Sequence, residues 1–306
     1  MAFCDAAVAG TTELVQFCEC GFPPFFRIRV PQFWSSPDDP VSNPGVAFFL
    51  SFLTRTGYNQ FILNISDVEI SNCKGEPILM QDGGSSVGYN QIYDCIFRNN
   101  GQPLRCQSGP GNNIIGPGNL VENAVSFGIP GFCDNDHIIG NEIFNAGEDG
   151  IMVSGGVNGE IKGNPVVGGV RNVSLMPNAS GWEVWHNTLV SARSEALATG
   201  NGAAADVQNN IFAYSGGWGV SASTVPSPLD YNLYYGNVSG DCNGCTIGLN
   251  AVTDDPAFVD MVSDNYLLDT GSNAIDAGAD LGWDLNGSTS GNYNGMAPDI
   301  GYDETE

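Results

Sequence analysis

Asn-Glu-Ile-Phe at 141–144 is the first of four versions of one phrase, followed by Asn-Pro-Val-Val (164–167), Asn-Thr-Leu-Val (187–190) and Asn-Asn-Ile-Phe (209–212). The phrases start 23, 23 and 22 residues apart. Weaker copies begin at Asp94, Gly118 and Tyr231. A step this regular is an internal repeat, and it predicts a solenoid of stacked coils.

Three sets of apolar residues keep the same step, as a continuous solenoid core requires. The first predicted column is Ile92, Ile114, Ile138, Ile161, Val184, Val207 and Leu229. The second is Ile96, Leu120, Ile143, Val166, Leu189, Ile211 and Leu233. The third is Leu104, Ile129, Ile151, Leu175, Leu197 and Val220. We therefore expect three short strands per coil, with side chains alternating between core and surface.

Three strands and about 22–23 residues per coil resemble the right-handed parallel β-helix proteins, the pectate-lyase-like group of carbohydrate-active enzymes and surface proteins. The resemblance covers roughly residues 60–300. It implies an all-β, right-handed parallel β-helix solenoid capped at both ends. In that family an asparagine ladder occupies the bend between the second and third strands, because Asn tolerates left-handed backbone and its amide can bond to the next coil. Here that bend holds Asn141, Asn164, Asn187 and Asn209.

The composition limits the class of protein. The 306 residues include 9 Lys+Arg and 34 Asp+Glu, a formal charge of −25. Such an acidic chain is a poor partner for nucleic acid or for an anionic membrane surface, and it has no apolar run long enough to span a membrane. An acidic surface fits an extracellular or cell-surface setting rich in calcium or salt, although solubility alone explains it equally well.

The repeat divides the chain into three parts. Residues 1–57 lack the repeat and show no signal peptide, and their apolar runs at 17–26 and 44–53 are expected to cap the solenoid or to form an assembly interface. Residues 58–235 are the predicted coils, and residues 236–306 are a closing segment expected to cap the last coil. The nine cysteines are an odd number, so at least one stays unpaired within the chain. A local disulfide between Cys242 and Cys245 is predicted, with Cys4 to Cys18 or Cys20, and Cys106 to Cys133, as further candidate pairs.

One polar column lies on the outward side of the predicted second strand. Its members repeat every 23 residues and are His137, Glu160, Glu183 and Asp206, flanked by Lys162 and Trp185. Stacked carboxylates repel one another unless a cation or water screens them, and a tryptophan ring can stack on a sugar. The column is therefore interpreted either as a solvated acidic face or as a substrate-binding face made of Glu160, Glu183, Asp206, Lys162 and Trp185.

A second polar column lies in the turn leading into the strand of the third apolar column, and contains Glu148, Asp149, Arg171, Arg193 and Glu195. In the pectate-lyase-like family acids near this strand hold Ca²⁺, and an Arg or Lys removes a proton beside the sugar carboxylate. The resemblance thus implies calcium ligands at Glu148 and Asp149, and catalytic candidates at Arg171, Arg193 and Glu195. A structural ion pair between Glu148 and Arg171 is the competing expectation, because the outward strand positions beside them contain hardly any acid.

Asp136 and His137 are further catalytic candidates, since Asp-Asn-Asp-His at 134–137 is similar to the acidic, His-containing loops of uronan epimerases. The plainer interpretation is turn formation before a strand. Two functions are compatible with these patterns. The first is a calcium-dependent lyase or epimerase acting on an acidic polysaccharide or cell-surface glycan. The second is a non-catalytic adhesin, tailspike-like protein or structural filament that self-assembles through its N-terminal region or its solenoid ends.

Overall fold

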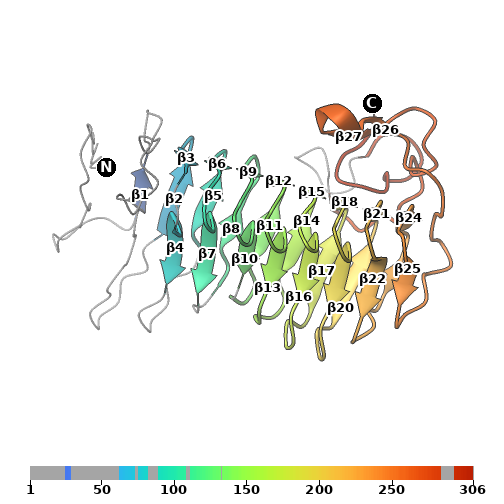
Figure 1. Ribbon diagram of the computed structural model, residues 1–306, viewed down its shortest axis with the longest axis horizontal. Coiled ribbons are helices and arrows are strands. Elements are labelled where there is room, and N and C mark those ends of the chain that lie inside the picture. Colours follow the sequence, from blue (N-terminus) through green and yellow to red (C-terminus); the bar gives the residue numbers. More distant parts are fainter. Residues whose placement is uncertain are drawn as a thin grey trace.

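A computed structural model describes residues 25–28, 62–72, 75–81, 89–107, 111–131, 133–283 and 293–305. The chain is an all-β, right-handed parallel β-helix, which confirms the predicted fold class (Figure 1). Its coils stack along one axis from β1 to β25, and three parallel sheets form the sides of the solenoid. No helix in the described part of the chain is long and apolar enough to cross a membrane.

The nine-stranded sheet contains β1 (Phe25–Ile28), β2 (Ile62–Ser66), β5 (Gln91–Tyr93), β8 (Ile114–Ile115), β11 (His137–Ile139), β14 (Glu160–Lys162), β17 (Trp182–Trp185), β20 (Ala205–Gln208) and β23 (Leu229–Asp230). The eight-stranded sheet contains β3 (Glu69–Ser71), β6 (Ile96–Arg98), β9 (Leu120–Glu122), β12 (Glu142–Phe144), β15 (Pro165–Val167), β18 (Thr188–Val190), β21 (Ile211–Ala213) and β24 (Leu233–Tyr235). The six-stranded sheet contains β10 (Ile129–Gly131), β13 (Ile151–Val153), β16 (Val173–Leu175), β19 (Leu197–Thr199), β22 (Trp218–Ala222) and β25 (Gly240–Asn243). A separate pair joins β4 (Ile78–Gln81) to β7 (Leu104–Gln107).

The predicted core columns are correct in most coils of the nine- and six-stranded sheets but in only three of the seven predicted coils of the eight-stranded sheet, and each error is a shift of one or two residues. In the nine-stranded sheet Ile115, rather than Ile114, stacks between Ile92 and Ile138. In the eight-stranded sheet the inward column is Ile70, Phe97, Val121, Ile143, Val166, Leu189, Phe212 and Tyr234. The predicted Ile96, Leu120, Ile211 and Leu233 therefore point outward. In the six-stranded sheet Val173, rather than the predicted Leu175, stacks between Ile151 and Leu197. Leu175 lies two residues further along the same strand and is also buried in the core.

The asparagine ladder is present, with one correction. Its members are buried and stack at the bend between the nine- and eight-stranded sheets: Asn119, Asn141, Asn164, Asn187, Asn210 and Asn232. Each amide nitrogen donates to the amide oxygen one coil on, as in the 2.9 Å bond from Asn164 to Asn187. Asn210, not Asn209, continues the ladder. Asn209 precedes it in the left-handed backbone region, at φ 58°.

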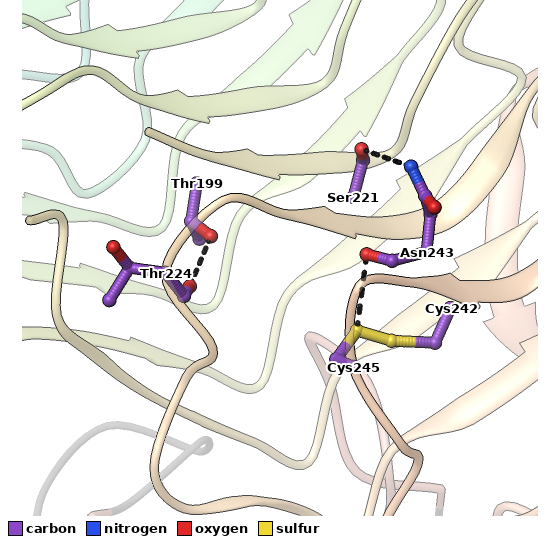
Figure 2. Close-up of a disulfide and its surroundings, with 6 residues drawn as sticks. All are labelled: Thr199, Ser221, Thr224, Cys242, Asn243 and Cys245. Atoms are coloured by element: carbon purple, nitrogen blue, oxygen red, sulfur yellow. Dashed lines mark hydrogen bonds between the residues drawn. A yellow bond between two sulfur atoms is a disulfide. The ribbon is translucent and has the colours of Figure 1, made fainter. Parts of the chain in front are cut away.

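The coil pattern continues past Tyr235, where the period becomes hard to read in the sequence. β25 pairs with β22, and Val252 forms a bridge to Leu233. The predicted disulfide between Cys242 and Cys245 is present, and both residues pack with Ile247 and Ala251 against the end of the core (Figure 2). This partial coil covers the C-terminal end of the solenoid core.

Residues 253–283 and 293–305, here called the strap, turn back along the solenoid rather than only closing its end (Figure 1). The strap contains β26 (Phe258–Asp260), a 3-10 turn (Met261–Ser263) and β27 (Asn265–Leu268). It packs on the outer face of the eight-stranded sheet. Tyr266 meets Val167 and Val190, and Ala274 and Ile300 pack with Ile211 and Leu233.

The expected N-terminal cap at residues 1–57 lies outside the described residues except for β1, which adds a parallel strand to β2. Cys133 is disulfide-bonded, while the side chain of Cys106, its predicted partner, lies outside the described part. Cys95 is buried and free, and burial raises its thiol pKa to about 11. A thiol with such a pKa is an inert core residue at neutral pH.

Candidate functional site: the outer face of the nine-stranded sheet

The predicted polar column forms on the outer face of the nine-stranded sheet. His137 pairs in register with Glu160, Glu160 with Glu183, and Glu183 with Asp206. Lys162 lies beside Trp185 in the neighbouring outward row. Parallel strands place such residues about 4.8 Å apart, so this face brings together the side chains that the sequence predicted to line a substrate-binding face.

Acid and base alternate along this face, so the carboxylates do not confront one another unscreened. His137 Nδ1 lies 2.6 Å from Glu160 Oε2. Lys162 Nζ lies 3.1 Å from Glu160 Oε1 and 2.6 Å from Glu183 Oε2. One lysine therefore bridges two coils, and we call His137, Glu160, Lys162, Glu183 and Trp185 the charged stripe.

The cation of the charged stripe is almost completely removed from water. Lys162 is 3% exposed, and its Nζ lies 3.9 Å from the centroid of the Trp185 ring. A desolvated ammonium over an indole face gains a cation–π attraction of about 2 kcal/mol. The lysine and the ring hold each other in place, and Trp185 itself stays partly exposed. The stripe thus presents a fixed aromatic ring at the surface.

The ion pairs shift two pKa values in opposite directions. The hydrogen bond from His137, with help from the nearby Lys162 ammonium, lowers the pKa of Glu160 to about 2. The same hydrogen bond with Glu160 raises the pKa of His137 above its usual 6.5. Glu160 is therefore a permanent anion near neutral pH, which makes it a poor proton donor.

The second predicted column forms a smaller group at the edge of the six-stranded sheet. Arg171 bridges Asp149, at 3.2 Å, and Glu195, at 3.3 Å. Asp149 is 4% exposed and also accepts a 2.6 Å bond from the Ser174 hydroxyl. The predicted pair of Arg171 with Glu148 is therefore wrong by one residue. Glu148 is exposed at the surface, because the turn places the neighbouring Asp149 inward.

These acids do not fit a calcium ion. A calcium site needs six to eight oxygen ligands, whereas the carboxylate of Asp149 is occupied by a guanidinium and a hydroxyl. Arg193 reaches back to the backbone oxygen of Gly147 at 2.5 Å, which adds a second positive group to the same edge. Among the described residues, no group of three or more His, Cys, Asp or Glu is arranged to hold a metal ion.

Asp136 lies away from both groups. It is 0% exposed, and its Oδ1 accepts bonds from the backbone and side-chain nitrogens of Asn113, at 3.0 and 2.8 Å. Asn113 and Asp136 thereby form part of a second, shorter side-chain ladder. This ladder ends at Asp136, because the corresponding residue of the next coil is Gly159, which has no side chain. The Trp182 ring packs against Gly159. The Oδ2 atom of Asp136 has no partner, and burial raises the pKa of this carboxyl to about 6. These contacts give Asp136 a structural role beneath the surface that His137 faces.

The sequence reasoning missed His186, which joins the strap to the coils. The equivalent bend position in earlier coils is Gly140 or Gly163, so a histidine there is the signal that was available. His186 is buried with φ 53°, its Nε2 accepts a 2.8 Å bond from Asn209 Nδ2, and its ring packs against Trp283 of the strap. Burial lowers its pKa to about 4. A neutral histidine at the seam is a packing element rather than a proton carrier at neutral pH.

A family model described as a right-handed β-helix region matches residues 54–212, which is just over half of the chain. The chain belongs to the right-handed β-helix family. No curated protein matches it. For a right-handed β-helix protein both a polysaccharide-related role and a structural role are compatible with the fold. The chemistry of its faces must therefore distinguish them.

Among the described residues, most basic side chains are already in contact with acids. Four of them contact carboxylates: Arg98 with Glu69 and Glu122, Arg105 with Glu76, Lys162 with Glu160 and Glu183, and Arg171 with Asp149 and Glu195. The whole chain carries a formal charge of −25. A polyanionic ligand would have to compete for these cations against acids that are already in contact with them.

Proposed function

We propose that this β-helix protein binds polysaccharide outside the cell, without cleaving it, on the charged stripe of the nine-stranded sheet. The observation that carries the proposal is the Trp185 ring held over the buried Lys162 ammonium. A ring fixed before binding loses little entropy when a sugar stacks on it. The neighbouring Glu160 and Glu183 carboxylates accept hydrogen bonds from sugar hydroxyls at positions that the coil register fixes.

The charge of this face favours a neutral polymer over the acidic one expected from the sequence. Glu183 and Asp206 extend the stripe toward the C-terminal coils, and Asp206 accepts a 2.9 Å bond from Gln208 rather than from a cation. A uronate chain along this row would meet fixed carboxylates, whereas a neutral chain meets hydrogen-bond acceptors. Calcium ions from solution are the condition under which an acidic polymer would bind.

Affinity electrophoresis tests this proposal. The native chain is run through gels containing a neutral glucan, a neutral xylan or a polyuronate, each with and without calcium. The proposal expects retardation in at least one neutral gel, and Trp185→Ala should abolish it. Trp218→Ala, which changes a half-buried tryptophan on the six-stranded sheet, is the matched control and should leave retardation unchanged. Retardation only by polyuronate without calcium would contradict the choice of ligand, and an unaffected Trp185→Ala variant would contradict the choice of face.

A lyase or epimerase acting on uronate polymers is the second candidate, because Arg171 is reachable. Its side chain is 37% exposed at the edge of the six-stranded sheet. The outward residues beside it are Pro130, Met152, Ser174, Ala198 and Ser221, which supply no acid to that sheet. A base tied to two carboxylates, on a face without further acids, is less well equipped for proton abstraction than for structure.

End-to-end assembly into a fibre is the remaining role, with fewer supporting contacts. The partial coil that contains Ile247 and Ala251 covers the C-terminal end of the core. Covered ends resist strand addition. Assembly through this end would require that the partial coil and its disulfide move aside, so any fibre would form through the N-terminal part of the chain.

A further inference from the structure

The chain contains a modification motif that the proposed function does not use. Asn-X-Ser/Thr, with X other than Pro, is the acceptor sequence for N-linked glycans. It occurs at Asn64, Asn172, Asn178, Asn237 and Asn286. Asn286 lies outside the described residues.

Burial separates the four described acceptor sequences. Asn172 is fully buried, and its amide donates to the backbone oxygens of Gly168, at 2.8 Å, and Val190, at 3.1 Å. The amide of Asn237 donates to the Phe212 backbone oxygen at 2.9 Å. Asn64 lies within β2 and is hydrogen-bonded between two neighbouring strands. In these three places the backbone or the amide is fixed by the coil.

Asn178 differs from these three in the exposure and freedom of its side chain, although its backbone N–H also donates to the Asn201 oxygen of the next coil, at 3.4 Å. It is exposed in the turn between β16 and β17, next to the exposed Met176 and Pro177. Within the described residues its side-chain amide makes no hydrogen bond. The turn already has φ 74° at Asn178, a left-handed conformation that asparagine tolerates well. Ser180, which completes the motif, is partly exposed on the same turn.

We propose that Asn178 is an acceptor for an N-linked oligosaccharide in the folded protein. The donor is a lipid-linked oligosaccharide. The Asn178 amide nitrogen forms a bond to the anomeric carbon of the first sugar, the lipid pyrophosphate leaves with the bonding electron pair, and the amide proton passes to solvent. Natural modification rests on the proposed placement of the chain outside the cell, whereas the acceptor property of Asn178 does not.

Asn172 provides a control only six residues away, in the same tryptic peptide after Arg171. The purified, folded chain is incubated with a single-subunit oligosaccharyltransferase and a lipid-linked oligosaccharide, and site occupancy is read by mass spectrometry. The same reaction is run on the urea-unfolded, diluted chain. Of the two acceptor sites in this peptide, we expect glycan at Asn178 alone in the folded chain, and at both Asn178 and Asn172 in the unfolded one.

Four results decide the proposal. Ser180→Ala should remove the folded-state product, and Ser239→Ala, which destroys the acceptor sequence of Asn237, should leave the product unchanged. An empty Asn178 in a folded chain whose unfolded form is modified would overturn the proposal. Modification of Asn172 in the folded chain would also overturn it, because burial would then not be the selecting feature. None of these outcomes depends on polysaccharide binding, so this proposal and the proposed function can fail separately.

Discussion

The two polar columns of this β-helix have the same order of charges but opposite burial. In the charged stripe a lysine bridges Glu160 and Glu183, and its side chain is 4% exposed. At the edge of the six-stranded sheet an arginine bridges Asp149 and Glu195, and its side chain is 37% exposed. The Lys162 ammonium has exchanged water for two carboxylates and an indole ring, whereas Arg171 keeps much of its hydration.

The difference in burial between Lys162 and Arg171 predicts a rigid cation in the charged stripe and a more mobile one at the edge of the six-stranded sheet. A buried cation cannot leave its partners without stranding their charges, so the stripe is rigid and Trp185 is held in one position. An exposed cation can exchange its partners for water at little cost. The same acid–base–acid arrangement therefore supplies a preorganised binding surface on one sheet, and on another a half-exposed arginine paired with the buried Asp149 carboxylate.

Replacing each cation by an uncharged residue of similar length gives the largest expected contrast. Lys162→Met leaves two facing carboxylates without their shared cation and should lower the free energy of unfolding by about 2–3 kcal/mol, less than a fully buried pair because both acids remain partly hydrated. Arg171→Met, the matched control, should cost less, about 1 kcal/mol, because the arginine is 37% exposed and the buried Asp149 keeps its bond from the Ser174 hydroxyl. Urea denaturation at pH 7 measures both. Equal losses of unfolding free energy in the two variants would contradict the difference between the buried lysine and the exposed arginine.

Asp136 extends the comparison to a buried carboxyl that, among the described residues, forms no ion pair, although the neighbouring His137 acts on it electrostatically. Its pKa is raised from 3.8 to about 6, so its contribution to stability is present below pH 3.8 and is lost as pH rises through 6. Asp136→Asn removes that loss and should stabilise the chain by about 1–2 kcal/mol above pH 7, with little effect near pH 4. Thermal denaturation across this range is the check. A variant that is destabilised at every pH would show that the carboxyl is required in the ladder.

The two histidines of the chain report on the stripe and on the strap seam separately. The His137 contribution is complete below pH 6.5 and is lost as pH rises through its raised folded pKa, whereas the Glu160 contribution is complete above pH 4.5 and is lost as pH falls toward about 2. The bridge is thus strongest between these limits. In an NMR titration Glu160→Gln should lower the pKa of His137 and leave that of His186 near 4. An unchanged His137 would mean that the 2.6 Å contact is not maintained in solution.

Arg171→Ala should give the smallest effect. If the arginine is structural, unfolding changes by about 0–1 kcal/mol, and neither the native chain nor the variant releases unsaturated uronate product with or without calcium. If the six-stranded sheet is catalytic, the native chain is active and the variant loses orders of magnitude in rate at unchanged stability. Absorbance of the unsaturated product, measured beside a melting curve, distinguishes the two cases.

The coil repeat could be read from the sequence because the ladder and the core demand the same residue types in every coil. The predicted core column was wrong by one residue in strands whose inward and outward side chains are both apolar. At Asn209-Asn210 either residue satisfies the pattern, and choosing the first moves Ile211 into the core in place of Phe212. Ile211 is itself fully buried, because the strap covers the outer face there. A one-residue slip exchanges the faces of a strand, and nothing local in the sequence shows that a distant segment covers the outer one.

The sequence also predicted which residues form the polar columns, but it did not predict how deeply each side chain is buried. Register placed His137, Glu160 and Glu183 together from their 23-residue spacing alone. That Lys162 is covered by the Trp185 ring depends on side-chain direction, which spacing does not specify. The choice of Asp149 over Glu148 as the partner of Arg171 depends on one turn in the backbone.

Hydroxyl-radical footprinting of the native chain, with and without the neutral polymer that retards it most, tests the binding face most directly. Trp185 on the nine-stranded sheet and Met176 beside the six-stranded sheet are both partly exposed and both readily oxidised, so one experiment reports on both faces. We predict that the polymer protects Trp185 and leaves the oxidation of Met176 unchanged. Protection of Met176 with an unprotected Trp185 would contradict the assignment of polysaccharide binding to the charged stripe.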